Sequence, residues 1–267
     1  MKILGLTGTE GKEISLPKQF KEDYHPDLIK RVVLSERAAK RQAYGAKDDA
    51  GQRSSAKLSR RRKDYKGAYG KGMSRAPRKT MWRRGLQFGW VGAWSPETRG
   101  GRKAHPPKSI KNWDLKVNNR EKMKAIRSAL SATINEEFVK MRNHITPSKF
   151  PVILESKIET LNKTKEVSTT LDALGFKEEL KRVKPRKIRS GRSRTNKYIT
   201  KKGPLFVVSK ECELTKSAEN IRGIEVVPVD NLTAELLAPG AKPGRLTIYS
   251  ERAIERLQKE NLYYPTK

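Results

Sequence analysis

Apolar residues along this chain follow two patterns: short uninterrupted runs, and spacings of three or four positions. The uninterrupted runs are typical of strands buried on both faces of a parallel sheet. We predict such strands at residues 152–154, 205–208, 224–229 and 246–249. Residues 4–7 are too short to be assigned as a strand alone, and residues 14–16 are their candidate pairing partner.

The spacings of three and four positions predict helices between these strands. One begins at Pro26, a residue suited to a first helical turn, and runs to about Tyr44, with Gly45 as its C-cap. The clearest helix runs from residue 118 to 134 and opens with Asn118 and Glu121 at capping-box spacing. Further helices are expected at residues 167–174, stopping at Gly175, and at residues 214–221, 231–238 and 250–257.

Alternation of strands and helices implies a parallel sheet with right-handed crossovers. We therefore predict an α/β protein, with a three-layer α/β/α domain around a mainly parallel sheet. This domain comprises residues 1–45 and 112–267. A long extended basic loop, residues 46–111, is inserted between the first two helices, and a second basic excursion occupies residues 184–203.

The net charge of the chain indicates what kind of partner it binds. The sequence has 267 residues, with 60 Lys and Arg against 29 Asp and Glu, a formal net charge of +31. Most of the excess lies in two segments, because residues 41–111 hold 20 basic residues and four acidic ones, and residues 184–202 hold nine basic residues and no acid. A free chain with this charge would repel itself, which predicts a polyanionic partner.

The inserted loop is poor in aliphatic side chains, yet it contains nine glycines and three of the four tryptophans. Cationic, glycine-rich backbone with interleaved aromatic rings suits a segment that packs against nucleic acid. A solvated linker is the plain alternative, but a linker has no use for three tryptophans. A membrane-surface segment would need an amphipathic helix, which the Gly and Pro spacing prevents.

Cations that can neutralise phosphates and rings that can stack on bases are therefore the predicted RNA-binding residues. In the loop they are Arg53, Lys57, Arg60, Arg61, Arg62, Lys63, Lys66, Tyr69, Lys71, Arg75, Arg78, Lys79, Trp82, Arg83, Arg84, Trp90, Trp94, Arg99, Arg102, Lys103 and His105. In the second excursion they are Lys184, Arg186, Lys187, Arg189, Arg192, Arg194, Lys197, Lys201 and Lys202.

Catalytic chemistry has little support in the sequence. The glycines of residues 5–11 lack the spacing of a P-loop or a dinucleotide fingerprint, so a turn between two short strands explains them, and an RNA-modifying enzyme with a degenerate site there is a remote alternative. The three histidines lie far apart, which disfavours a metal site. Cys212 is expected to be a structural thiol, and Asp172, Glu178 and Glu179 to be solvated helix-surface charges.

We expect neither a membrane helix nor a signal peptide in this chain. No run approaches the roughly 18 apolar residues of a membrane helix, and residues 1–5 lack the apolar stretch of a signal peptide. We therefore expect a cytosolic protein with no membrane partner.

Several motifs resemble those of a known family, and their order and spacing extend over nearly the whole chain. They are Gly70-Lys71-Gly72 with Arg75, Trp82-Arg83-Arg84-Gly85, Gly100-Gly101-Arg102-Lys103-Ala104-His105-Pro106-Pro107-Lys108, Arg127-Ser128-Ala129-Leu130-Ser131-Ala132-Thr133, Asp172-Ala173-Leu174-Gly175 and Lys202-Gly203-Pro204-Leu205. The chain thereby resembles the large-subunit ribosomal protein four family in its archaeal and eukaryotic branch. The eukaryotic members generally carry long C-terminal extensions, so the end at Lys267 favours the archaeal side.

The resemblance implies a structural, non-catalytic constituent of the large ribosomal subunit. Members of the family bind large-subunit ribosomal RNA through a globular α/β domain and a long loop, whose tip helps to line the peptide exit tunnel. The tip would correspond to about residues 71–90 here. Expected partners are this RNA, neighbouring large-subunit proteins and the nascent peptide, with no homo-oligomer and no cofactor besides Mg²⁺ and K⁺ belonging to the RNA. A free regulatory protein acting on messenger RNA is the alternative, since it would use the same chemistry.

Overall fold

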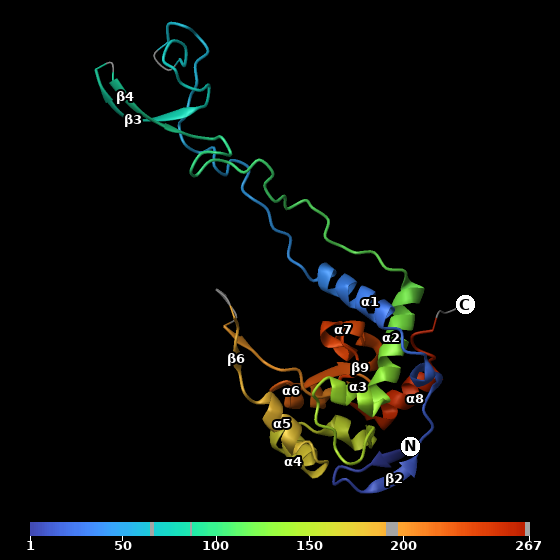
Figure 1. The fold of residues 1–267 in the computed structure, drawn as a ribbon. Coiled ribbons are helices and arrows are strands. Elements are labelled where there is room, and N and C mark those ends of the chain that lie inside the picture. The colour runs from blue at the N-terminus through green and yellow to red at the C-terminus, as the bar shows by residue number, and fades with distance from the viewer. Residues whose placement is uncertain (65–66, 86, 191–196, 265–267) are drawn as a thin grey trace. The chain divides into compact units, whose positions relative to one another are not determined.

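The computed structural model describes residues 1–64, 67–85, 87–190 and 197–264 (Figure 1). The chain forms two compact units. The first, the globular unit, comprises Met1–Lys40 and Asp114–Lys267, and the second, the inserted unit, comprises Arg41–Trp113.

A mixed six-stranded sheet forms the centre of the globular unit, in the order β2-β1-β5-β10-β8-β9. The strands are β1 (Lys2–Leu4), β2 (Glu10–Glu13), β5 (Val152–Leu154), β8 (Leu205–Val208), β9 (Glu225–Pro228) and β10 (Thr247–Ser250). Only the β1–β2 pair is antiparallel. This arrangement confirms the predicted α/β fold with a mainly parallel sheet.

Helices cover both faces of the sheet (Figure 1). One face packs against α1 (Pro26–Ala39), α2 (Asn119–Ile134), α7 (Ala234–Leu237) and α8 (Glu251–Lys259), together with the 3₁₀ turns η1 (Lys18–Lys21), η3 (Val229–Asn231) and η4 (Pro239–Ala241). The other packs against α3 (Glu136–Met141), α4 (Thr164–Ala173), α5 (Lys177–Val183), α6 (Glu213–Glu219) and η2 (Ser156–Thr160). Side chains of β8 alternate between these layers: Leu205 and Val207 enter the first core, Phe206 and Val208 the second.

Strands β5 and β8 have the predicted bounds, and β9 and β10 differ by one residue at their ends. The first strand pair lies earlier than the apolar residues indicated. The chain turns after Leu4, where the Gly5 N–H donates to the Thr9 carbonyl at 2.8 Å, so β1 ends at Leu4 and pairs with Glu10–Glu13. Of residues 14–16, Ile14 continues the pairing, because its N–H donates to the Met1 carbonyl at 2.7 Å. Gly8 has a φ of 82° inside this turn, which confirms that a turn between two strands explains the glycines.

Three helix predictions need correction. Helix α1 begins at Pro26 as predicted but ends at Ala39 rather than about Tyr44, and its C-cap is Lys40. The predicted C-cap, Gly45, instead packs against Ser109 in the inserted unit. The capping box of α2 does not form, since the Asn118 side chain makes no capping hydrogen bond and the Glu121 carboxylate lies 3.4 Å from Arg31. The predicted helix at residues 231–238 is shorter: the Thr233 side chain caps it, accepting from the Leu236 N–H.

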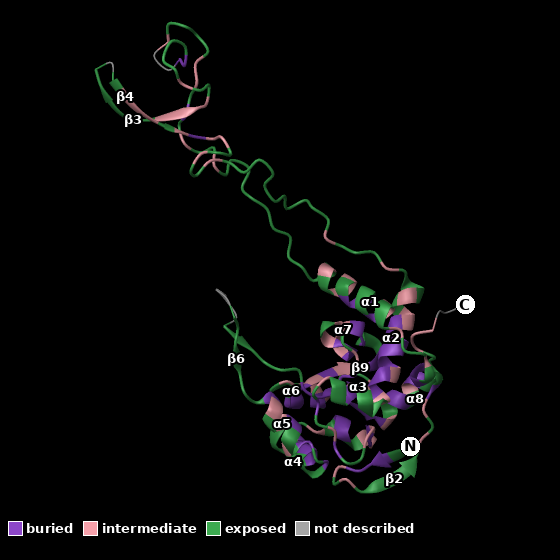
Figure 2. Ribbon diagram, in the orientation of Figure 1, coloured by how far each residue is buried: buried purple, intermediate pink, exposed green. Residues whose placement is uncertain are grey.

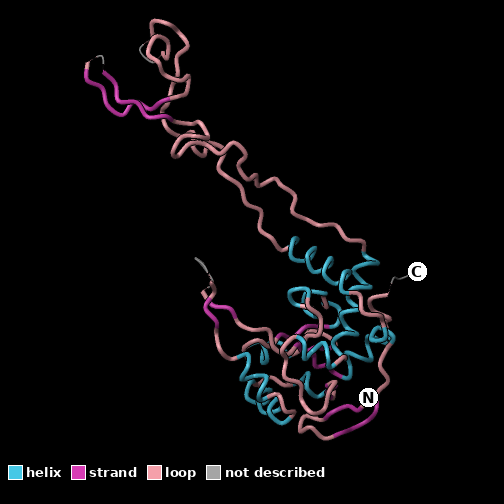
Figure 3. The backbone as a smooth tube through the Cα atoms, in the orientation of Figure 1, coloured by secondary structure: helices cyan, strands magenta, loops and turns pink. Residues whose placement is uncertain are grey.

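Several elements were not predicted, and they are short or highly polar. They are α3, α5, the hairpin β6 (Lys187–Ile188) and β7 (Tyr198–Ile199), and the hairpin β3 (Arg78–Arg84) and β4 (Gln87–Gly92) (Figure 3). The inserted unit is therefore not simply an extended loop. Its described buried hydrophobic side chains are the alanines Ala56, Ala68 and Ala93, too small to form a core (Figure 2).

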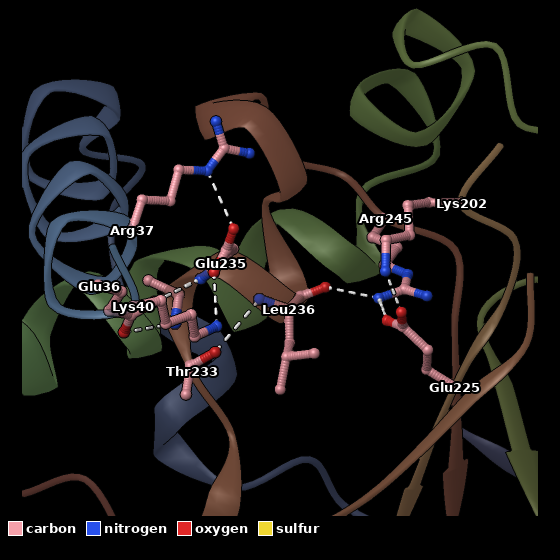
Figure 4. Close-up of polar contacts among 10 residues, drawn as sticks. Glu36, Arg37, Lys40, Lys202, Glu225, Thr233, Glu235, Leu236 and Arg245 are labelled. Atoms are coloured by element: carbon pink, nitrogen blue, oxygen red, sulfur yellow. Dashed lines mark hydrogen bonds and ion pairs between the residues drawn. The ribbon is translucent and has the colours of Figure 1, made fainter. Parts of the chain in front are cut away.

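Charged groups fasten the end of α1 to the start of α7 (Figure 4). The Glu36 carboxylate accepts hydrogen bonds from the N–H groups of Ala234 and Glu235, at 3.3 and 2.8 Å. The Glu235 carboxylate accepts in turn from Arg37 and Lys40, at 2.9 and 2.7 Å. A carboxylate at a helix N-terminus satisfies free N–H groups, so α1 is fixed at the point where the chain enters the inserted unit.

Candidate nucleic-acid interface

The β3–β4 hairpin organises the part of the inserted unit predicted as the tip. Its strands pair from Arg78 opposite Gly92 to Arg84 opposite Gln87. The rings of Phe88 and Trp90 stack on one face, with centroids 5.4 Å apart. Cations lie against both rings, because the Lys71 ammonium is 5.1 Å from the Trp90 centroid and the Arg83 guanidinium 5.3 Å from that of Phe88.

Trp82 presents an aromatic surface on this hairpin. Its indole lies over Gly89, where a Cβ would come within 2.1 Å of the ring nitrogen. Trp82 is 56% exposed and its neighbour Met81 64% exposed. An exposed indole next to Arg83 and Arg84 can stack on a base while the guanidinium groups bind phosphate.

Close backbone contacts hold the hairpin's base. The Ala93 N–H donates to the Pro77 carbonyl at 2.9 Å, and the Arg102 N–H donates to the Trp94 carbonyl at 3.3 Å. The indole N–H of Trp94 donates to the Ser54 carbonyl at 3.0 Å. Trp94 therefore serves the internal structure of the unit, and a base would have only part of its ring to contact.

Most predicted binding residues lie on the surface. Those exposed in the inserted unit are Arg53, Lys57, Arg60, Arg61, Arg62, Lys63, Tyr69, Lys71, Arg75, Trp82, Arg83, Arg84, Arg99, Arg102, Lys103 and His105. Those half-buried are Arg78, Lys79, Trp90 and Trp94. Exposed in the second excursion are Lys184, Arg186, Lys187, Arg189, Lys197, Lys201 and Lys202. Lys66, Arg192 and Arg194 lie outside the described residues.

The electrostatics of the two units differ. All 17 ion pairs found among the described residues lie in the globular unit, and none joins two described residues of the inserted unit. The inserted unit nevertheless holds 20 basic residues against four acidic ones. The unit therefore has an excess of 16 positive charges, which its own four acidic residues cannot balance.

The second excursion carries the β6–β7 hairpin. The Arg186 guanidinium and the Lys197 ammonium lie 5.7 and 5.9 Å from the centroid of the Tyr198 ring. Ile188, in β6, is 62% exposed. The hairpin thus presents cations together with apolar surface.

Both ends of this excursion are fastened at the amino ends of β8, β9 and β10. The Arg222 guanidinium donates to the Lys184 carbonyl at 3.1 Å, and Arg182 donates to the Lys202 carbonyl at 2.9 Å. The Lys202 ammonium itself pairs with Glu225, so this predicted RNA-binding cation is already engaged (Figure 4).

Glu225 also accepts from Arg245 at 2.6 Å (Figure 4). Arg245 in turn donates to the Gly203 carbonyl at 3.0 Å. Arg245 is fully buried. Burial raises the pKa of Glu225, but Arg245 and Lys202 outweigh it and the net shift is downward. The ion pair therefore stays charged and fixes the strand end to which the excursion returns.

One acidic residue was wrongly predicted as a solvated surface charge. Asp172 and Glu178 are exposed, but Glu179 is fully buried. It accepts from Arg182 at 2.6 Å and contacts the ring nitrogen of His144 at 2.7 Å. Burial raises the pKa of Glu179, but hydrogen bonds from Arg182, His144 and the Ile145 N–H lower it to about 2. Burial lowers the pKa of His144.

The carboxyl ends of the parallel strands, where α/β proteins commonly bind ligands, are occupied by a side chain of the protein. The Glu159 carboxylate accepts from the N–H and hydroxyl of Ser209, both at 2.8 Å, and from the Ser250 hydroxyl at 2.6 Å.

Cys212 is half-buried, and burial raises the pKa of its thiol. Among the described residues no group of His, Cys, Asp and Glu is arranged to hold a metal ion. No described helix is long and apolar enough to span a bilayer.

Three residues near the two ends of the inserted unit, Arg41, Tyr44 and Trp113, were not predicted as part of the interface. Trp113 stacks on Tyr44, and the guanidinium of Arg41 lies 3.8 Å from the centroid of the Trp113 ring. Arg41 and Tyr44 lie about 70 positions before Trp113, so the local sequence does not reveal their contact. The charge of Arg41 and the presence of a fourth tryptophan were the only features that could have indicated it.

A basic α/β protein with an inserted cationic unit is the class that this fold and this interface define. The model of the Ribosomal protein L4/L1 family matches residues 14–260, and the chain belongs to this family. It is 43% identical to the large ribosomal subunit protein uL4 of Nanoarchaeum equitans, over 98% of both chains. It is 38% identical to the protein of that name from Archaeoglobus fulgidus, over 96% of this chain and 97% of the relative. For that of Methanococcus maripaludis the identity is 40%, over 96% and 98%.

Proposed function

We propose that this chain is a structural, non-catalytic constituent of the large ribosomal subunit in the cytoplasm, and that it binds the RNA of that subunit. One observation carries the proposal: the inserted unit concentrates 20 basic residues against four acidic ones, and most of its cations are exposed. RNA phosphates would supply the missing negative charge. The names of the archaeal relatives support the ribosomal setting.

The side chains of the inserted unit suit RNA better than a generic polyanion. Tyr69 and Trp82 are exposed rings, 42% and 56% accessible, and both lie near arginines. Aromatic stacking recognises unpaired bases, which RNA offers in its loops and bulges. Cations alone would bind any polyanion, so the exposed rings favour RNA.

The resemblance to the family implies a location for the tip of the inserted unit within the large subunit. Residues 71–90 would reach the wall of the peptide exit tunnel, near the nascent peptide, while other large-subunit proteins lie beside the globular unit. The β3–β4 hairpin supports this assignment, because it is a narrow element whose outer residues Met81 to Gly85 are all exposed.

A salt series with a charge variant tests RNA binding. In the full chain, R83Q/R84Q removes two candidate phosphate contacts on β3. We expect affinity for large-subunit RNA to fall severalfold at low salt, and the slope of log affinity against log salt to become less steep by about 1.4 to 1.8. The matched control is K177Q/K181Q, which removes two exposed lysines of α5 that make no ion pair among the described residues. Equal losses of RNA affinity in R83Q/R84Q and K177Q/K181Q would contradict the proposal.

A further inference from the structure

A hollow in the inserted unit is lined by residues distant in sequence. Its apolar and aromatic walls are Tyr44, Pro106, Pro107, Ile110 and Trp113. Its volume is about 770 Å³, within the range of roughly 300–1,000 Å³ for small-ligand sites. It is thus large enough for a single nucleotide.

Backbone contacts between the two chain segments build this hollow. The Ala46 N–H donates to the Pro107 carbonyl at 2.9 Å. Gly45 packs so closely on Ser109 that a Cβ would lie 2.6 Å from its nitrogen. The two prolines restrict the backbone of the second segment, so the walls are held in place.

The charge around the hollow has one sign. Lys103, Lys108 and Lys111 line it, and none of its lining residues is acidic. The Lys111 ammonium lies 4.4 Å from the centroid of the Trp113 ring. The lysines can therefore attract the phosphate of a nucleotide at the place where the aromatic walls can stack on its base.

Exposed apolar side chains indicate that this surface is covered in the assembled state. Ile110 is 86% exposed and Tyr44 49% exposed, although both border the same hollow. Apolar and aromatic side chains gathered on one exposed surface are typical of a binding site.

We infer that this hollow binds one unpaired nucleotide of RNA, with the base against Tyr44 and Ile110 and the phosphate on the lysines. The inference rests on the proposed function, because that function supplies the RNA. A base in a continuous duplex is stacked between its neighbours and cannot enter, so the ligand is a nucleotide from a loop, bulge or single strand.

Zero-length photocrosslinking of intact large subunits tests the inference. After ultraviolet irradiation and digestion, mass spectrometry maps the peptides of this chain that carry a nucleotide. We expect a nucleotide on residues 103–113 or on Tyr44, from one fixed position in the RNA. Crosslinks on the β3–β4 hairpin with none at the hollow would overturn this inference and leave the proposed function standing. Absence of the chain from large subunits would overturn both.

Variants make the test specific. Y44A and I110S should each lower the crosslink yield on residues 103–113 at least fivefold, while Y44F, which keeps the ring, should retain it. M141S is the matched control, since Met141 is 79% exposed in α3 of the globular unit, and it should change nothing. A protein neighbour crosslinked at the hollow in place of RNA, or equal yields in I110S and M141S, would refute nucleotide binding there.

Discussion

Glu179 illustrates how single charged residues hold the globular unit together. Its carboxylate is enclosed by Arg182, His144 and the Ile145 N–H, so every oxygen has a donor. Removing one partner from a buried ion pair leaves the other charge uncompensated, which costs more than the pair contributes. The cluster joins α5 to the segment after α3, and Arg182 extends it to the second excursion through the Lys202 carbonyl.

E179Q should therefore destabilise the chain by about 3 kcal/mol near neutral pH. The folded-state pKa of Glu179 is about 2, below its ordinary 4.5, so its contribution is present above about pH 4.5 and is lost as pH falls toward 2. The stability difference between wild type and E179Q should shrink over that interval. Urea unfolding at a series of pH values measures it, with E178Q as the control because Glu178 is exposed on the same helix. A difference independent of pH would contradict this account.

At the scale of elements, glycine allows the second excursion to return to the sheet. Gly223 has a φ of 78°, and a Cβ there would lie 2.2 Å from Val183 Cγ1 and 2.8 Å from the Lys201 carbonyl. Its own carbonyl accepts from the Gly203 N–H at 2.9 Å. The approach of these two backbone segments sets where the excursion ends and β8 begins.

G223A should destabilise the chain by about 3 kcal/mol, the sum of left-handed backbone strain and overpacking. Gly240 provides a matched control, since its φ is 77° but nothing lies within 4 Å of its Cβ position. G240A should cost only the strain, about 1 kcal/mol. Chemical denaturation compares the two variants, and equal losses would show that the close contact has no energetic weight.

Elements with continuous apolar runs or long helical spacing could be predicted from the sequence, because their patterns record burial directly. Strand β8 and helix α2 are examples. The β3–β4 hairpin could not, because β3 contains four Arg and Lys residues among seven and its pairing depends on a turn at Gly85. The same limit applies to the candidate interface. Its cations could be predicted because charge is visible in the local sequence, whereas the Tyr44–Trp113 contact forms only when two distant segments meet.

Burial of charged groups also escaped prediction. Arg127, in α2, pairs with Glu22 at 2.9 Å and donates to the Tyr263 carbonyl at 2.6 Å, which uses three distant parts of the chain. Nothing in the local sequence distinguishes such an arginine from a solvated one. Long-range pairing is the physical reason that Glu179, Arg245 and Arg127 were not identified as interior residues.

At the scale of the whole molecule, folding and binding are divided between the two units. Both hydrophobic core clusters consist of residues of the globular unit. The inserted unit contributes charge and exposed rings rather than apolar burial. The fold should therefore not depend on the inserted unit.

Replacing Arg41–Trp113 with a short Gly/Ser linker should leave a protein that unfolds in one cooperative transition and keeps its α/β circular dichroism. The Ser35 hydroxyl donates to the Leu115 carbonyl, so α1 contacts the segment that follows the inserted unit, and a linker has to span only the last turn of that helix. Calorimetry of the full chain and the shortened chain makes the comparison. Loss of cooperative unfolding in the shortened chain would mean that the inserted unit stabilises the core.

The central claim, that this chain is built into the large ribosomal subunit by its RNA contacts, is tested most directly by sedimentation of cell lysate at low and high salt. Six or more purely electrostatic phosphate contacts lose roughly 10³-fold in affinity between about 50 and 200 mM salt. We predict that the chain stays with the large subunit through a high-salt wash, because stacking and enclosure by RNA add to the charge contacts. A chain that remains at the top of the gradient, or leaves the particle at modest salt, would contradict the account and favour a free regulatory RNA-binding protein.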